Sequence, residues 1–256
     1  MKVPPNATSK VPPVILAFWA VKILATTVGE TGGDTVSMTL DLGYALSTVV
    51  FLAFFGGTLA AQVLSRRYHP LAYWAVVVAT TTVGTTASDY FDRTIELGYV
   101  KSSAILLGGV VLVLLVWKRV TGRIAYNEVT SRKDEIFYWL TILVSNTLGT
   151  ALGDFVATTV GLGFELGALV FAALIALVAA THFFARLPTN LLFWAAYVLT
   201  RPLGATLGDT LTKPHAEGGL GLGRIVSSVL LLVAMIIVVL TTVLRKPGQV
   251  ERPKMA

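Results

Sequence analysis

The chain of 256 residues contains no cysteine, so disulfide bonds and thiolate metal sites are excluded. It is also poor in charge: charged residues make up 13 % of the chain, whereas apolar residues make up 55 %. This balance excludes an ordinary soluble domain and is typical of a helical membrane protein. Apolar runs such as 105–117 and 230–244 lack the alternating polarity of β-barrel strands, which disfavours a barrel.

Motifs of soluble enzymes are missing as well. The chain has no phosphate-binding loop and no His-Glu-x-x-His motif, and its glycine-rich segment 218–223 opens an apolar run without the context of a nucleotide site. The three histidines have no metal-ligand spacing. We therefore expect no enzymatic activity and no cofactor. Residues 1–10 lack a small-residue cleavage site, so we also expect no removable signal peptide.

One sequence pattern is present four times, over residues 19–34, 74–89, 139–154 and 194–209. Each copy begins with Trp, has Gly ten positions later and ends with Asp fifteen positions after the Trp. A plain apolar segment follows each copy after a short turn that ends in Leu-Gly. The sequence therefore predicts four repeats, each of them a two-helix hairpin.

The repeats predict an all-α polytopic membrane protein with eight transmembrane helices, each long enough at about 1.5 Å per residue to cross the bilayer core. The predicted spans are 14–35, 42–64, 71–89, 99–117, 136–154, 164–184, 191–209 and 225–244. They form one membrane domain, 1–245, with half one at 14–117, a cytoplasmic linker at 118–135, half two at 136–244 and a cytoplasmic tail at 246–256. Because each half has four spans, we expect parallel repeats and pseudo-symmetry about an axis along the membrane normal.

The basic residues predict the orientation. Fourteen of the twenty Lys and Arg lie on the side of the N-terminus, four lie on the other side and two lie within spans. Since Lys and Arg accumulate in cytoplasmic loops, both termini are expected in the cytoplasm of a multi-pass protein of the bacterial inner membrane. This topology also explains the net charge of +6 without a nucleic-acid partner. Acidic residues gather at the outer side, which either attracts cations there or only mirrors the same loop rule.

The candidate site is a polar stripe on the repeated helices. Positions 8, 11 and 15 after each Trp share one helix face. They carry Thr27, Thr82 and Thr147, then Glu30, Thr85 and Thr150, then Asp34, Asp89, Asp154 and Asp209. Carboxylate and hydroxyl oxygens suit hard cations such as Mg²⁺, Ca²⁺ and Mn²⁺. Two interpretations stay open: the five acids bind an ion while the threonines line its path, or each Asp caps its own hairpin.

Two cations lie in mid-span, Lys22 and Arg201, where an unpaired charge is costly. We expect each to pair with an acid of the stripe, either as a gating counter-ion or in a static salt bridge. The repeated Gly is expected to let helices approach closely. The repeated Trp is expected to anchor the helices at the membrane interface.

The pattern resembles a bacterial integral-membrane family of unknown function, whose members have four tandem repeats, each with two transmembrane segments and a characteristic Trp. Trp19, Trp74, Trp139 and Trp194 match those tryptophans, and the resemblance covers about residues 14–244. It implies the architecture and brings no activity. Residues 30–35 are also similar to the Glu-x-Gly-Asp motif of a calcium/manganese exchanger family, with one additional residue.

Our leading hypothesis is a transporter of a divalent metal cation, with proton coupling as an option. A passive cation channel formed by the four Asp, and a membrane scaffold or sensor that transports nothing, are the alternatives. The expected partners are the lipid bilayer and a small inorganic cation. The identity of the ion and the formation of a homo-oligomer stay open.

Overall fold

The structure is a computed structural model, and it describes residues 9–65, 68–124, 126, 127, 129–184 and 187–244. Within these ranges it contains eight α-helices and no strand. They are α1 (Leu16–Asp34), α2 (Gly43–Leu64), α3 (Pro70–Asp89), α4 (Tyr99–Thr121), α5 (Arg132–Asp154), α6 (Gly163–Phe184), α7 (Thr189–Thr212) and α8 (Arg224–Leu244). All eight predicted spans are therefore helical, and the all-α fold class is confirmed. The proposed tail, 246–256, lies outside the described residues.

Short turns extend three of the repeated helices beyond the Asp. Five-residue π-helical turns follow α1, α3 and α5 at Thr35–Thr39, Tyr90–Thr94 and Phe155–Thr159. A single 3₁₀ turn, His215–Glu217, follows α7. The sequence did not predict these turns. Each lies between a repeated helix and the outer helix that follows it in the chain.

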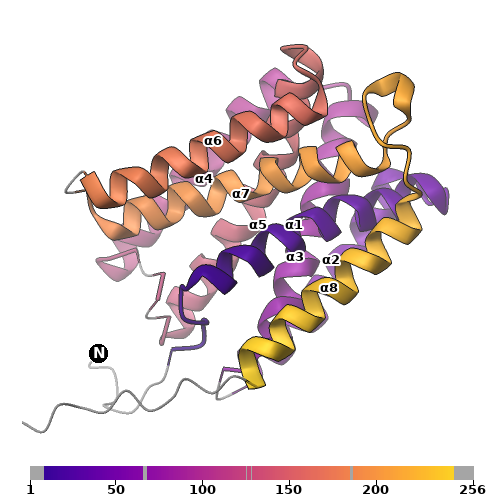
Figure 1. Cartoon of the computed structure of the whole chain (residues 1–256). Helices are drawn as coiled ribbons and strands as arrows, with labels where there is room; N and C mark the ends of the chain where they lie inside the picture. The colour runs from indigo at the N-terminus through magenta and orange to yellow at the C-terminus, as the bar shows by residue number, and fades with distance from the viewer. Residues whose placement is uncertain (1–8, 66–67, 125, 128, 185–186, 245–256) are drawn as a thin grey trace, which may run out of the picture.

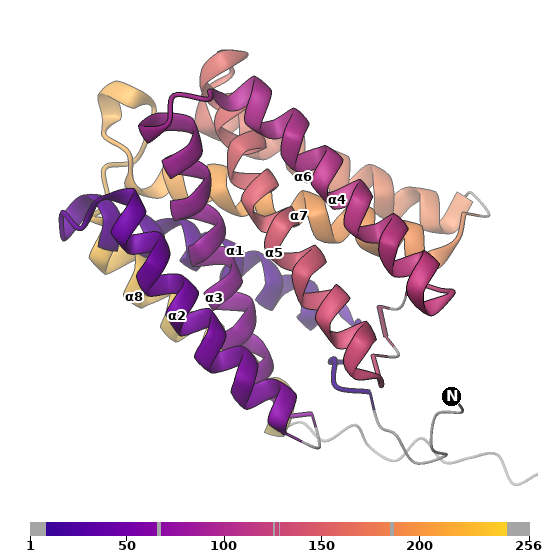
Figure 2. The same cartoon turned by 180° about the vertical axis from the view of Figure 1, so that it is seen from behind.

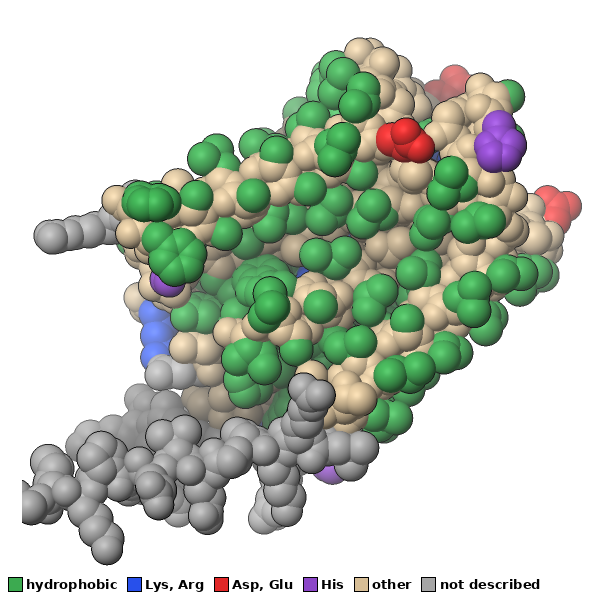
Figure 3. Space-filling model, in the orientation of Figure 1, with side chains coloured by type: hydrophobic (Ala, Val, Ile, Leu, Met, Phe, Trp, Pro, Cys, Tyr) green, Lys and Arg blue, Asp and Glu red, His purple; other side chains and the backbone are tan. Residues whose placement is uncertain are grey.

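The odd-numbered helices form the inside of the molecule. Helix α1 packs on α3, α3 on α5, α5 on α7, and α7 again on α1, so that the four make a closed ring (Figures 1 and 2). The even-numbered helices lie around this ring. Their outward side chains are apolar, as at Leu169 of α6 and Ile237 of α8, and Figure 3 shows apolar side chains spread over this face.

The two helices of each predicted hairpin do not pack on each other. The second helix of each repeat packs on the first helix of the next repeat: α2 on α3, α4 on α5, α6 on α7, and α8 on α1. The two helices of one repeat contact each other little. Each outer helix therefore ties two repeats together, and the contact of α8 with α1 joins the two ends of the chain. The two predicted halves of the membrane domain, 14–117 and 136–244, pack on each other through α3 with α5 and α1 with α7.

Five helices are long and apolar enough to cross a membrane: α2, α4, α5 with its π turn, α6 and α8. Helices α1, α3 and α7 are not in this set, and they belong to the ring, where they carry buried polar side chains such as Lys22, Thr85 and Arg201. Burial behind the outer helices keeps these polar groups from lipid, as a hydrocarbon environment requires. The sequence and the fold together define a helical membrane protein.

The repeated glycines allow the four inner helices to pack closely in the ring. An added Cβ at the repeated Gly would overlap the residue that lies seven positions after the Trp in the next repeat. The contacts are Gly29 with Thr81, Gly84 with Asn146, Gly149 with Arg201, and Gly204 with Thr26. The expected structural role of this Gly is thus confirmed, in the manner of small-residue packing between membrane helices.

An aromatic layer closes the end of the ring on which the N-terminal segment lies. The residue before each Trp contacts the Trp of the next repeat, and all four ring-centroid distances are between 5.3 and 5.8 Å. The pairs are Phe18–Trp74, Tyr73–Trp139, Tyr138–Trp194 and Phe193–Trp19. The expectation of interfacial anchors is wrong for Trp74, Trp139 and Trp194, which are buried within this aromatic layer.

The glycine contacts give a first prediction. Gly29→Ala should lower the apparent Tm of the purified protein, because the methyl group overlaps Thr81 and overpacking costs about 1–3 kcal/mol. Gly57→Ala on α2 is the matched control, since no atom lies within 4 Å of its added Cβ. There, the better helix propensity of Ala should leave the Tm unchanged or raise it. Equal effects of the two substitutions would contradict the proposed packing.

Candidate functional site

Arg201 connects all four repeats. Its side chain is fully buried, and Nη2 lies 2.7 Å from Oε2 of Glu30 and 2.6 Å from the hydroxyl oxygens of Thr85 and Thr150. Glu30, Thr85 and Thr150 occupy the same position in repeats one, two and three. Repeat four has Ala205 at this position. Arg201 lies one helical turn before Ala205, and its guanidinium group contacts the side chains that the other three repeats have there. The predicted pairing of Arg201 with an acid is confirmed.

Lys22 is also fully buried, but its predicted acid partner is not found. Its Nζ lies 3.4 Å from Oδ1 of Asn146 and 4.2 Å from the centre of the Tyr197 ring. Asn146 in turn donates from Nδ2 to Oγ1 of Thr80, over 3.0 Å. No carboxylate in the described part of the chain forms an ion pair with Lys22, because Arg201 holds Glu30 and the aspartates lie nearer the outer end. An amide and an aromatic face take the place of the acid.

The four aspartates are buried beyond Glu30, and each pairs with a basic residue of the outer segments. The ion pairs are Asp89–Arg93 at 2.9 Å, Asp154–Arg93 at 3.2 Å, Asp34–Arg224 at 3.5 Å and Asp209–Lys213 at 3.7 Å. Arg93 thereby bridges repeats two and three, and Arg224 brings the start of α8 to the end of α1.

The capping interpretation of the aspartates does not fit these contacts. Asp34, Asp89 and Asp154 stand at the start of their π turns, and none of the three side chains accepts a capping hydrogen bond from that turn. Their buried carboxylates are compensated by charge instead. Arg93, Lys213 and Arg224 are three of the four basic residues counted on the outer side in the sequence, and their pairing with the aspartates was not predicted. The four-residue spacing of Arg93 from Asp89 and of Lys213 from Asp209 was the available signal.

Three carboxylates come close enough together to share one ion. Single oxygen atoms of Glu30, Asp34 and Asp209 lie within 4.8 Å of one another, and all three residues are buried. The prediction placed five acids together, but Asp89 and Asp154 are outside this group, where Arg93 bridges them. The group brings together the ends of α1 and α7, the first and last repeated helices, which the closed ring makes neighbours.

The threonines divide into two sets. Thr85 and Thr150 belong to the Arg201 cluster, as described above. Thr27, Thr82 and Thr147, the predicted lining residues at position 8, each donate to a carbonyl oxygen one turn back in their own helix. Such bonds satisfy a hydroxyl group at membrane depth without a partner from another helix.

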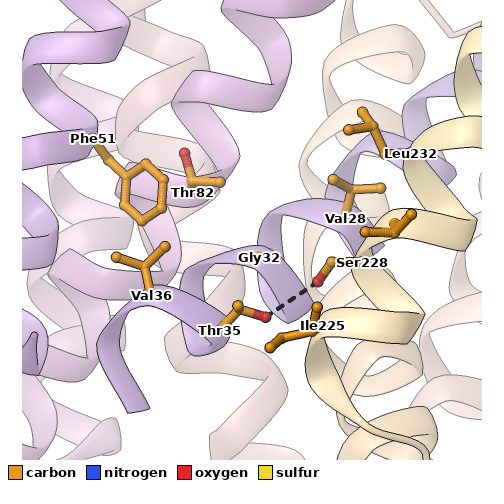
Figure 4. A pocket seen from close by; sticks show the side chains of 10 residues that line it. Val28, Gly32, Thr35, Val36, Phe51, Thr82, Ile225, Ser228 and Leu232 are labelled. Carbon is orange, nitrogen blue, oxygen red and sulfur yellow. Dashed lines mark hydrogen bonds between the residues drawn. The ribbon is translucent and has the colours of Figure 1, made fainter. Parts of the chain in front are cut away.

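A groove on the outside of the ring is separate from this cluster. It has a volume of about 290 Å³ and lies between α2 and α8, where Val28, Phe51, Thr82 and Leu232 line it (Figure 4). The hydroxyl groups of Thr35 and Ser228 lie 3.4 Å apart at its edge. The hydroxyl group of Thr82 donates to its own helix and the other walls are apolar, so that the groove does not offer a second ion site.

Fold and site therefore describe a helical repeat protein of the membrane, with a buried and mutually compensated set of charges inside a ring of four helices. The model of the family described as Repeat of Unknown Function (DUF347) matches the chain four times, at residues 17–68, 72–123, 137–187 and 192–247. The chain belongs to this family, as the four tryptophans led us to expect. No curated protein and no solved structure matches the chain.

The central ion pair gives a second prediction. Glu30→Gln should lower the apparent Tm strongly, because it leaves the buried Arg201 without a carboxylate, a loss of about 3–5 kcal/mol. Glu165→Gln, at an exposed acid of α6, is the control and should have no effect. The double variant Glu30→Gln with Arg201→Gln should be more stable than Glu30→Gln alone. A double variant that loses the sum of the two single effects would argue against a direct ion pair.

Proposed function

We propose that the protein is a transporter of a divalent metal cation in the bacterial inner membrane, with both termini in the cytoplasm and all eight helices crossing the bilayer. The observation that carries this proposal is the group of Glu30, Asp34 and Asp209, whose oxygen atoms lie within 4.8 Å of one another. Metal–oxygen distances of roughly 2.1–2.6 Å allow two ligands of one ion to be up to about 5 Å apart. The group therefore has the size of a single hard-cation site.

The basic partners of this site support exchange. Arg224 and Lys213 lie 3.5 and 3.7 Å from Asp34 and Asp209, which are longer contacts than the 2.7 Å between Arg201 and Glu30. Both basic residues belong to outer segments, and the Arg224 side chain is 23 % exposed. A cation that arrives from the outer side would displace these two side chains from their carboxylates. Protons are the proposed coupling ion. After a carboxylate releases the metal, either a proton or a basic side chain can neutralise its charge.

The channel and scaffold alternatives have less support. A passive channel needs an open path, whereas Arg201, Lys22 and the aromatic layer fill the ring below the carboxylates. The scaffold alternative predicted aspartates that bond to backbone amides. Asp34, Asp89 and Asp154 contact basic side chains instead, and these contacts favour the transporter.

A flux panel tests the proposed function. Proteoliposomes with the wild-type protein are tested with Mn²⁺, Mg²⁺, Ca²⁺, Zn²⁺ and Na⁺, and they should take up at least one of these ions. Asp34→Asn and Asp209→Asn should each reduce the uptake by more than about tenfold, because a ligand is lost. Asp89→Asn and Asp154→Asn should reduce it less, since neither belongs to the group. Asp41→Asn, at an exposed acid, is the control. Absence of ion flux in the wild type would refute the proposal.

The orientation has its own test. The chain has no cysteine, so a single introduced thiol reports one position without background. In intact cells, an impermeant maleimide should label Glu217→Cys between α7 and α8 and should not label Lys118→Cys at the end of α4, although both positions are exposed in the fold. The opposite pattern would reverse the proposed topology.

A further inference from the structure

The buried centre of the ring has more hydrogen-bond donors than acceptors. Among the described residues, the hydrogen bonds of the Arg201 side chain all come from Nη2, which donates to Glu30, Thr85 and Thr150. Its Nε and Nη1 are buried, and no group in the described ranges accepts a hydrogen bond from either atom. A guanidinium group has five N–H donors, and unpaired buried donors are unfavourable. The two free nitrogen atoms therefore need an acceptor that the described residues do not supply.

Lys22 has the same deficit. Its ammonium group has three donors, and among the described residues it has one hydrogen-bond acceptor, Oδ1 of Asn146, at the long distance of 3.4 Å. Within the same residues, Glu30 is the one acid in ion-pair contact with Arg201. Of the two buried basic side chains at the centre of the ring, Arg201 therefore has an ion-paired carboxylate and Lys22 has none in the described part of the chain.

We infer that a small monovalent anion of the halide class binds between Lys22 and Arg201. It would accept hydrogen bonds from the free nitrogen atoms of Arg201 and from Lys22. Both side chains are 0 % exposed, so a bound anion would be enclosed by the helices, and a single-atom ion needs the least space there. The hydroxyl group of Tyr197, whose ring contacts Lys22, is a further buried donor without a partner among the described residues.

This anion site is distinct from the proposed cation site, although the two share Glu30. The carboxylate of Glu30 and the anion compete for the same guanidinium group. Removal of the Glu30 charge should therefore strengthen anion binding, whereas a merely structural role of the ion pair predicts no such gain. This consequence separates the anion site from a cluster of charges that only holds the helices together.

Chloride binding to the full-length protein in lipid nanodiscs tests the inference. Radioactive chloride should bind saturably with one ion per chain in a gluconate buffer, and bromide should compete for it. Lys22→Met and Arg201→Gln should each weaken binding by more than about tenfold. Lys101→Met, at an exposed lysine of α4, is the matched control and should bind as the wild type does.

Glu30→Gln is the decisive variant, because misfolding cannot produce a gain. It should bind chloride more tightly than the wild type, and chloride should raise its apparent Tm relative to gluconate at equal ionic strength. Absence of saturable chloride binding in the wild type, which would mean that water satisfies the donors, overturns the inference. A Glu30→Gln variant that binds no more tightly also overturns it. Metal flux is a separate readout, so either proposal can fail without the other.

Discussion

The low polarity of the membrane interior is the constraint on which the structure depends. A charge in such surroundings must be compensated by a contacting group, because water is not there to solvate it. Arg201 meets this requirement through Glu30 and the hydroxyl groups of Thr85 and Thr150, and so needs residues from the other three repeats. The ring must therefore close for its central charge to be stable. The glycines make this closure sterically feasible, and the outer helices keep the polar side chains from lipid.

The positions at which the repeats differ contribute the charged side chains at the centre of the ring. Four identical copies would give a symmetric ring without a preferred site. Repeat one contributes Lys22 and Glu30, and repeat four contributes Arg201, so that the charges meet where the first and last repeated helices pack together. The Glu30, Asp34 and Asp209 group lies at this same junction. Two unlike repeats within a regular framework thus bring the charged residues of the proposed site together at one place.

Much of the fold could be predicted from the sequence, because burial in a membrane leaves long apolar segments and the stretch from Trp to Asp has the same length in all four repeats. The partner of each outer helix could not, since nothing in the residue pattern shows that α2 packs on α3 rather than on α1. At the site, the polar stripe in the sequence was enough to predict Glu30 and the four aspartates as candidate residues. The partners of Lys22 and the role of Arg224 depend on contacts between distant segments, which residue spacing does not encode. The buried Trp74 was missed because an interfacial Trp and a buried one look alike in a single sequence.

The central claim is that carboxylates at the junction of repeats one and four can exchange a basic partner for a metal cation. Mn²⁺ binding to the purified protein, measured by electron paramagnetic resonance in the wild type and in Arg224→Gln, tests it most directly. The account predicts one Mn²⁺ per chain and tighter binding in Arg224→Gln, because the guanidinium no longer competes for Asp34. No saturable Mn²⁺ binding, or an Arg224→Gln variant that binds Mn²⁺ no more tightly than the wild type, would contradict it.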